Sequence, residues 1–436
     1  MAEIAIIGAG SQVFAQAMVR DALTFPTLAD STFRLMDTDP EPLGYMETVA
    51  HKMVKQGGYP ARVRATTDRR EALDGADYVI VAILVGGREP IIDEIDIPLR
   101  HGVSQCIGDT MGPGGIFRFM RTLPAMIEIA YDMEELCPDA LMINYTNPMS
   151  MLCEGVRESS DIEIVGLCHS VQAAHSELAQ VIGEKPADCA SWTAGINHQA
   201  WVLYYTCAGE DAYPRIREAA QKNENWYNGN TTRVEMLRHL GYYVTESSGH
   251  NSEYNPWFRK REDLIEKYQG EDWNGATGFI KKIYTTDRNA YMGALRRVAE
   301  QTKEFDLKRG HEYGACVMNA VETGETFRFN ATMENTGLIT NLPLGCSVEV
   351  PCFADKAGVH PCHVGHLPPQ LAALNSMAVQ SMSMAVQAAL TGDKETLYWS
   401  VAYDPLTAAA LSLQEIRDMV DELFEAEKSR MPQFRD

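Results

Sequence analysis

Cys168 and His198 are the residues of this chain whose types and settings point most directly to metal chemistry. Cys168 follows an apolar stretch at 162–167, and His198 follows a second apolar stretch. Thiolates and imidazoles bind transition-metal ions. Two protein ligands leave positions open for substrate oxygens and water, as a catalytic metal requires, whereas structural zinc needs four ligands. His169 and His175 compete as ligands on sequence grounds alone.

A second chemical signal lies at the start of the chain. A short apolar strand at residues 4–7 is followed by Gly8, Ala9, Gly10 and Ser11, and then by a helical pattern. Gly8 and Gly10 would let the backbone approach a pyrophosphate, whose charge then meets the helix N-terminus beside Ser11. The third glycine of a complete dinucleotide fingerprint is replaced by Val13, so the match is partial.

Asp37 strengthens the cofactor prediction. It ends the second predicted strand, where a carboxylate accepts hydrogen bonds from the adenosine ribose hydroxyls. Because a carboxylate would repel a 2′-phosphate, we expect NAD and not NADP. The alternative is that Asp37 caps a helix that begins near Pro40.

The elements that must position these residues read as an α/β fold. Short apolar strands alternate with helical stretches such as 117–136, which predicts a Rossmann-type parallel sheet covered on both faces. The predicted strands are residues 4–7, 33–36, 63–65, 78–82, 141–143 and 162–167. Mixed strands near 338–353 and a long helical region at 368–427 follow. We therefore predict an NAD-binding domain at 1–190 and a substrate-binding, metal-binding and oligomerisation domain at 191–436.

The composition narrows the possible partners and compartment. The chain has 436 residues, of which 45 % are hydrophobic, and its formal net charge is −22. Such a surface repels phosphate backbones, so we expect no nucleic-acid partner and no membrane partner. No stretch reads as a signal peptide or a membrane span. The ten cysteines lack a compact disulfide spacing, which favours a reducing cytoplasm with mostly buried thiols.

Taken as a set, the polar motifs of the chain resemble those of glycoside hydrolase family four, the NAD- and metal-dependent glycosidases. The motifs span almost the whole chain, in order: 8–11 (Gly-Ala-Gly-Ser), 108–115 (Gly-Asp-Thr-Met-Gly-Pro-Gly-Gly), 144–148 (Asn-Tyr-Thr-Asn-Pro), 168–172 (Cys-His-Ser-Val-Gln), 195–198 (Gly-Ile-Asn-His), 241–248 (Gly-Tyr-Tyr-Val-Thr-Glu-Ser-Ser) and 341–343 (Asn-Leu-Pro). Cys-His-Ser-Val is similar to the α-galactosidase, or melibiase, branch.

The resemblance implies a fold, two cofactors and a reaction. The C-terminal part would be an α+β domain like that of lactate and malate dehydrogenases, and the cofactors would be NAD and Mn²⁺. In this family NAD⁺ takes a hydride from C3 of the sugar, a base removes the C2 proton, the C1 substituent leaves, water adds, and the hydride returns. The substrate would be a small-molecule α-glycoside, most simply an α-galactoside.

The resemblance also assigns roles to single residues. Cys168 and His198 match the metal ligands, and Asp109 matches an acidic position facing the leaving group, where burial could raise its pKa for general-acid work. We expect Asn147 and His169 to bind the sugar. The alternatives for Asp109 and Asn147 are caps on the helices predicted to begin near Ile116 and after Pro148.

The resemblance does not settle which tyrosine is the base. Tyr242 and Tyr243 both match the base of related enzymes, and the alternative for each is aromatic packing in a strand.

One residue departs from the melibiase pattern. Arg88 stands in Gly86-Gly87-Arg88-Glu89, where melibiase-like members carry tyrosine. An arginine near C6 would suit an anionic sugar, such as a sulfoquinovoside, a 6-phospho-glycoside or a uronide. The alternative is an ion pair with Glu89, Asp93 or Glu94.

Other functions share parts of these signals. A 2-hydroxy-acid dehydrogenase has a similar fold but needs no Cys/His metal pair, and it accumulates NADH. A non-catalytic NAD-sensing module has no reason to keep the metal pair together with the Asp109 loop. As for assembly, we expect a homodimer or homotetramer.

Overall fold

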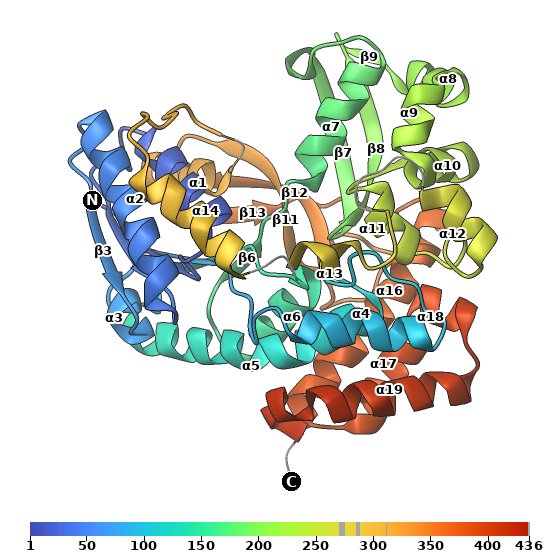
Figure 1. Ribbon diagram of the computed structural model, residues 1–436. Helices are drawn as coiled ribbons and strands as arrows, with labels where there is room; N and C mark the ends of the chain where they lie inside the picture. The colour runs from blue at the N-terminus through green and yellow to red at the C-terminus, as the bar shows by residue number, and fades with distance from the viewer. Residues whose placement is uncertain (270–274, 285–287, 311, 435–436) are drawn as a thin grey trace.

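One mixed sheet runs through the computed structural model, which describes residues 1–269, 275–284, 288–310 and 312–434 (Figure 1). Its strand order along the main path is β10-β8-β7-β12-β11-β6-β5-β4-β1-β2-β3. The part from β6 to β3 is parallel and has the doubly wound order 3-2-1-4-5-6 of dinucleotide-binding folds. These six strands are β1 Glu3–Ile7, β2 Thr32–Met36, β3 Arg62–Thr66, β4 Tyr78–Val81, β5 Leu141–Asn144 and β6 Ile164–Gly166.

The rest of the sheet is antiparallel and joins the parallel part where β11 pairs with β6. A hairpin of β7 and β8 forms the part of the sheet that carries His198. The remaining strands are β7 Cys189–Ile196, β8 Gln199–Cys207, β9 Glu210–Asp211, β10 Tyr243–Val244, β11 Phe327–Glu334, β12 Ser347–Asp355 and β13 Gly358–Pro361.

Helices cover the sheet and build a separate layer at the C-terminus (Figure 1). Helices α1 to α7 are Gln12–Leu23, Pro40–Gly57, Arg69–Leu73, Pro90–Arg100, Gly112–Leu136, Met149–Ser159 and Ser170–Val181. Helices α8 to α14 are Tyr213–Lys222, Glu224–Gly229, Thr231–Leu240, Ser248–Glu253, Glu262–Gln269, Phe279–Tyr284 and Arg288–Glu300. Helices α15 to α19 are Gly314–Thr323, Pro369–Thr391, Lys394–Ala402, Pro405–Ala410 and Leu413–Glu427. The short 3₁₀ helices are Pro186–Asp188, Lys428–Arg430 and Pro432–Phe434.

These elements confirm the predicted fold class, and the six predicted strands all occur. The apolar strands are buried on both faces, as the continuous runs in β1, β4 and β5 indicate. The long helical region at 368–427 is divided into α16 to α19, because Gly392, the Asp-Pro step at 404–405 and the Ser412 cap of α19 interrupt it. Among the described residues, no helix has the length and apolar character that a membrane crossing requires.

The cysteines depart from the expectation in one place. Cys189 and Cys207 form a disulfide, because they face each other in the antiparallel register of β7 and β8. Spacing alone did not reveal this pair, since the hairpin register depends on the turn at Asn197 and His198. The other eight cysteines are free, and five of them are buried.

Candidate active site

Four loops that carry predicted site residues leave the sheet at the same edge. Parallel strands end at one edge, so the loops after β1, β4, β5 and β6 lie together there. They carry Gly8 to Ser11, Arg88, Asn147 and Cys168, respectively. The segments that follow β4 and β5 are joined by a hydrogen bond from Ile83 N–H to Thr146 Oγ1 at 3.0 Å.

Cys168 and His198, predicted as a metal pair, meet in the structure. Their ligand atoms and a carboxylate oxygen of Glu246 all lie within 4.8 Å of one another. His198 Nε2 is 3.8 Å from Glu246 Oε2. Sequence reasoning named the first two residues and missed Glu246, although it lies in the stretch 241–248 that was singled out for its tyrosines.

The imidazole of His198 is held on its other side. Its Nδ1 atom lies 3.0 Å from Thr110 Oγ1 and 3.4 Å from the hydroxyl of Tyr254. Both partners and His198 itself are buried. Metal-binding histidines are usually oriented by a hydrogen bond to the second ring nitrogen. This arrangement directs Nε2 toward Cys168 and Glu246.

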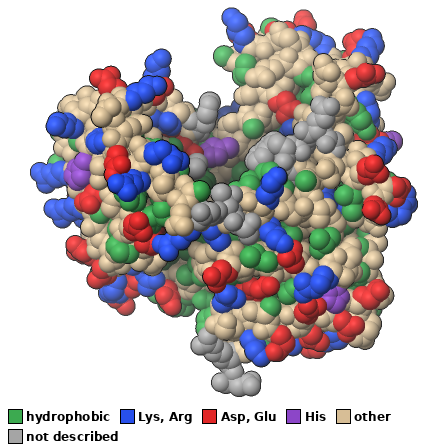
Figure 2. Space-filling model, viewed as in Figure 1, with side chains coloured by type: hydrophobic (Ala, Val, Ile, Leu, Met, Phe, Trp, Pro, Cys, Tyr) green, Lys and Arg blue, Asp and Glu red, His purple; other side chains and the backbone are tan. Residues whose placement is uncertain are grey.

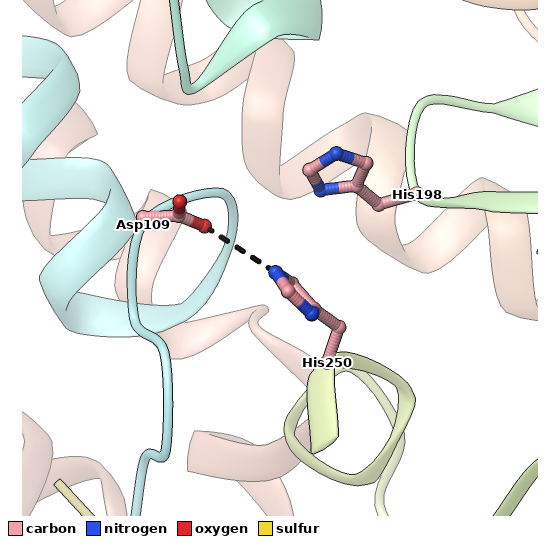
Figure 3. A group of neighbouring side chains, drawn as sticks. All are labelled: Asp109, His198 and His250. Carbon is pink, nitrogen blue, oxygen red and sulfur yellow. Dashed lines mark ion pairs between the residues drawn. The ribbon is translucent and has the colours of Figure 1, made fainter. Parts of the chain in front are cut away.

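Asp109 and His250 approach the same histidine from other elements (Figure 3). Asp109 Oδ1 lies 3.9 Å from His250 Nε2, and His250 Nδ1 lies 3.3 Å from Glu246 Oε1. Burial alone would raise the pKa of Asp109, but the neighbouring charges of His250 and Arg118 outweigh it and lower that pKa. The expected rise by burial is therefore wrong for this arrangement.

The loop that carries Asp109 is fixed by Glu253, the last residue of α11. The carboxylate of Glu253 accepts hydrogen bonds from the backbone N–H groups of Cys106, Ile107 and Gly108, at 2.6, 3.0 and 2.8 Å. Helix α5 has Met111 at its N-cap with no side-chain cap, so Asp109 does not cap it. Glu253 and His250 were both missed from the sequence, where nothing links residues so far apart.

The cluster has a negative character that favours a cation. Burial alone would lower the pKa of His198, but the negative groups Cys168 and Glu246 raise it above its ordinary value. Behind them lies Glu349 of β12, which is 1 % exposed and has one carboxylate oxygen without a hydrogen-bond partner among the described residues. Burial raises the pKa of Glu349 well above its ordinary value.

The donor set fits a divalent transition-metal ion. Cys168, His198 and Glu246 supply sulfur, nitrogen and oxygen from three segments, and such mixed sets suit ions like Mn²⁺ or Zn²⁺. Three donors or fewer leave positions for substrate oxygens. The residues present therefore fit the metal that the sequence predicted.

The first loop fits a dinucleotide. Gly8 has a φ of 90°, and a side chain there would place its Cβ 2.2 Å from the carbonyl oxygen of Ala82, so only glycine fits. Ser11 is the N-cap of α1 and makes no side-chain cap, which leaves the helix N-terminus available to a phosphate. A Cβ at Gly10 would come within 2.7 Å of the Asp37 carboxylate.

Asp37 is oriented by this loop and does not cap α2. Its Oδ2 atom accepts from Gly10 N–H at 2.8 Å and its Oδ1 from Asp39 N–H at 3.0 Å. The cap of α2 is Asp39, whose side chain accepts from Glu41 N–H. The alternative interpretation of Asp37 is thus wrong, and the carboxylate stands beside Gly10 as a ribose-binding acid must.

The predicted sugar-binding residues Asn147 and His169 differ in their contacts. Asn147 does not cap α6, and its side-chain oxygen is buried without a hydrogen-bond partner among the described residues. His169 Nε2 is 2.7 Å from Glu312 Oε2, and that hydrogen bond raises the pKa of His169. His175 instead contacts Ser191 and the carbonyl oxygen of Pro186, which gives it a structural setting and not a metal-binding one.

The two tyrosines predicted as base candidates point elsewhere. Tyr243 is fully buried, and its hydroxyl donates to Glu177 at 2.8 Å, in a cluster with Trp226. Burial raises the pKa of Tyr243 well above its ordinary value. Tyr242 packs its ring edge-on against Tyr213, with centroids 6.0 Å apart. The tyrosine whose hydroxyl reaches His198 is Tyr254.

Arg88 lies after β4 as expected, and its guanidinium carbon is 4.6 Å from the ring centroid of Tyr291. Tyr291 in turn donates its hydroxyl to the carbonyl oxygen of Gly10 at 3.2 Å. Of the acids named as alternatives, Glu94 pairs with Arg121 and Glu89 lies 3.9 Å from Arg430. Arg88 therefore adjoins the cofactor loop as well as the edge of the sheet.

The molecular surface is hollowed between the N-terminal lobe and the lobe of β7 and β8, and histidine side chains are visible in the hollow (Figure 2).

Comparison with known proteins now identifies the class. Residues 3–184 match the model of the family 4 glycosyl hydrolases, and residues 193–407 match that of the family 4 glycosyl hydrolase C-terminal domain. The chain belongs to family 4 of the glycosyl hydrolases and is a glycoside hydrolase.

Particular relatives narrow the comparison. The chain is 39 % identical to an α-galactosidase of Bacillus subtilis (strain 168), with 100 % of both chains covered. It is 36 % identical to an α-galactosidase of Rhizobium meliloti (strain 1021), covering 99 % of this chain and 89 % of that one. A solved 6-phospho-α-glucosidase from gut microorganisms, in complex with NAD and Mn²⁺, has the same fold, with a TM-score of 0.84, 19 % identity and 99 % of both chains covered. Family membership also overrules the dehydrogenase and NAD-sensor alternatives.

Proposed function

We propose that the chain hydrolyses α-galactosides, with NAD and Mn²⁺ as cofactors. The observation that supports this most is the meeting of Cys168 and His198 in one buried cluster beside Asp109. The full-length similarity to two α-galactosidases supports the choice of sugar. When bound, NAD⁺ supplies a hydride acceptor for a sugar carbon, and Mn²⁺ supplies Lewis acidity toward sugar oxygens.

Each cofactor has residues suited to hold it. Gly8, Gly10 and Ser11 would cradle the pyrophosphate, and Asp37 would accept hydrogen bonds from a ribose. Cys168 and His198 would hold the metal. These assignments follow the sequence prediction, and the local geometry supports them through the glycine-only turn at Gly8 and the oriented carboxylate of Asp37.

The remaining polar groups would handle the sugar and its protons. Asn147 offers a buried amide oxygen that has no hydrogen-bond partner in the described part of the chain and could accept a hydrogen bond from a sugar hydroxyl. Asp109 and His250 form a pair that could hold a proton near the leaving-group oxygen. For removal of a carbon-bound proton, the sequence predicted Tyr242 or Tyr243, but the position of the Tyr254 hydroxyl, 3.4 Å from His198, favours Tyr254.

A panel of 4-nitrophenyl α-glycosides tests the proposed function. Enzyme supplied with NAD⁺, Mn²⁺ and a reductant should release nitrophenol from the α-galactoside faster than from the α-glucoside, the α-galacturonide or a 6-phospho-α-glycoside. NADH should not accumulate, because the reaction returns its hydride in every cycle. Full activity in enzyme stripped of NAD would contradict the proposal. A preference for an anionic glycoside would show that the substrate is an anionic sugar and not an α-galactoside.

Three broader expectations stay predictions. The division at residue 190 and a cytoplasmic location are kept. Eight cysteines are free and five of these are buried, whereas the Cys189–Cys207 disulfide is not typical of a reducing compartment. A homodimer or homotetramer is kept because α16 and α17 expose an uncharged groove. The groove is lined by Ser376, Met377, Gln380, Met384, Trp399 and Tyr403. Light scattering after size-exclusion chromatography measures the assembly directly.

A further inference from the structure

A metal site made of Cys168 and His198 alone does not explain why Glu246 lies beside them. Its Oε2 atom lies 3.8 Å from His198 Nε2, and its carboxylate belongs to the same group of ligand atoms as the Cys168 sulfur. Donors that share one ion lie roughly 3–4 Å apart when each is about 2.0–2.5 Å from it. The separation of these two atoms falls in that range.

The backbone that presents Glu246 is built and not accidental. Glu246 has a φ of 66°, which a residue with a side chain rarely adopts. On one side Thr245 is bonded to β8, through Thr245 N–H to Ala200 O at 2.8 Å and Ala200 N–H to Thr245 Oγ1 at 3.1 Å. On the other side Ser247 caps α11 by accepting from His250 N–H. Such strain at a well-anchored position is typical of functional sites.

His198 also has a positive φ, and its imidazole lies beside the carboxylate of Glu246. Its φ is 65°, at the turn between β7 and β8, and its Nδ1 side is occupied by Thr110 and Tyr254. The nitrogen that remains for an ion is therefore Nε2, the atom nearest Glu246. Two strained, anchored residues thus point their ligand atoms at one place beside Cys168.

We propose that Glu246 is a third protein ligand of the divalent cation, completing a thiolate, imidazole and carboxylate set with Cys168 and His198. The inference rests on the proposed metal dependence and deepens it. The two anionic ligands would balance the charge of a dication inside a buried site, and the carboxylate adds the oxygen donor that Mn²⁺ prefers. Three ligands would still leave positions for substrate oxygens and water.

Two other arrangements compete with this one. In the first, Glu246 serves only as the ion-pair partner of His250, whose Nδ1 is 3.3 Å away. In the second, the cation sits in the other possible ligand group, Asp109, His198 and His250, which Figure 3 shows converging from three elements. The second alternative makes His250 necessary for metal binding, whereas the first makes neither Glu246 nor His250 a ligand.

The experiment measures Mn²⁺ affinity in the NAD-loaded enzyme, with free Mn²⁺ followed by EPR. The variants are Glu246→Gln, His250→Gln and Cys168→Ser. The matched control is Glu235→Gln, which removes one carboxylate from α10, where it pairs with Arg238 and His239. Circular dichroism and NAD affinity check that each variant is folded. Co²⁺ in place of Mn²⁺ gives a second readout, since its thiolate charge-transfer band reports Cys168 and its visible bands report coordination number.

We expect Glu246→Gln to weaken Mn²⁺ binding about tenfold or more, because an uncharged amide replaces an anionic oxygen donor. Its Co²⁺ complex should keep the thiolate band and change its visible bands. Glu235→Gln should bind Mn²⁺ as the wild type does, and His250→Gln, which removes only a neighbour of Glu246, should lose less affinity than Glu246→Gln and keep the visible bands.

Wild-type affinity in Glu246→Gln would overturn this inference alone and leave the proposed function standing. A loss in His250→Gln as large as that in Glu246→Gln, with altered visible bands of the Co²⁺ complex, would also overturn it, in favour of a set that includes His250. Absence of Mn²⁺ binding in the wild type, or unchanged binding in Cys168→Ser, would contradict the metal site itself. If Glu246→Gln fails to fold, Glu246→Asp takes its place, because it keeps the charge and shortens the reach of the carboxylate. It should weaken Mn²⁺ binding and change the visible bands of the Co²⁺ complex, and wild-type values of both would overturn the inference.

Discussion

Substitution of Arg88 separates two roles that lead to different substrates. If Arg88 reads an anionic group at C6, its loss should harm only anionic glycosides. The structure instead stacks its guanidinium on Tyr291, 4.6 Å from the ring centroid, and Tyr291 donates to the carbonyl oxygen of Gly10. We therefore expect Arg88→Gln to weaken NAD binding and to spare the distinction between neutral and anionic sugars.

The magnitudes of the two roles can be told apart. A cation–π contact contributes about 0.5–2 kcal/mol, so the Kd for NAD should rise about 2- to 30-fold. A charged hydrogen bond to an anionic substrate contributes about 1.5–3 kcal/mol, so its loss would lower kcat/KM about 10- to 150-fold on that substrate alone.

The assay combines calorimetric NAD binding with kcat/KM at saturating NAD, on 4-nitrophenyl α-galactoside and α-galacturonide. Tyr291→Leu should reproduce the effect of Arg88→Gln on NAD, and the double variant should lose less than the sum of the two, because the pair interacts directly. A selective loss on the galacturonide, with NAD binding intact, would refute the reasoning and make the anionic sugar the substrate.

Three further outcomes are expected. Cys168→Ser, or exhaustive chelation of the wild type by EDTA, should abolish turnover while circular dichroism stays unchanged, and full activity after chelation would contradict the metal site. Tyr254→Phe should suppress both turnover and the incorporation of deuterium at C2 of the product in D₂O far more than Tyr243→Phe does, whereas the reverse ranking would restore the sequence prediction. Arg121→Met should destabilise the fold by about 3–5 kcal/mol in urea unfolding, because it leaves the buried carboxylate of Glu94 unpaired, and Glu94→Gln in the same chain should recover part of that loss.

The local geometry at Gly8 and Asp37 could be predicted from the sequence, for a local reason. Strands β1 and β2 are short apolar runs, and Gly8 and Asp37 stand directly at their ends, so the turn and its acid are set within a few residues of the chain. The positive φ of Gly8 favours glycine at that single position. The close approach of the Ala82 carbonyl oxygen adds a contact between distant residues, which the sequence alone did not show.

The surroundings of Tyr242 and Tyr243 could not be predicted in the same way. Tyr243 begins a two-residue strand and Tyr242 directly precedes it, and neighbouring side chains of a strand point to opposite faces. Which face meets Glu177 and which meets Tyr213 depends on the pairing of Tyr243 with Val202, 41 residues earlier. So short a strand shows no alternation from which its buried face could be recognised.

The catalytic half of the site is made by contacts that no local pattern records. The loop before Asp109 offers three consecutive backbone N–H groups, and a single carboxylate, that of Glu253, accepts all three. Glu253 ends the same short helix that carries His250, and Glu246 lies two residues before that helix begins. The segment 246–253 therefore positions the Asp109 loop, His250 and the carboxylate facing His198 together. A change in α11 should thus disturb all three at once, which is why residues in this segment must be tested by measurements that separate metal affinity, NAD affinity and turnover.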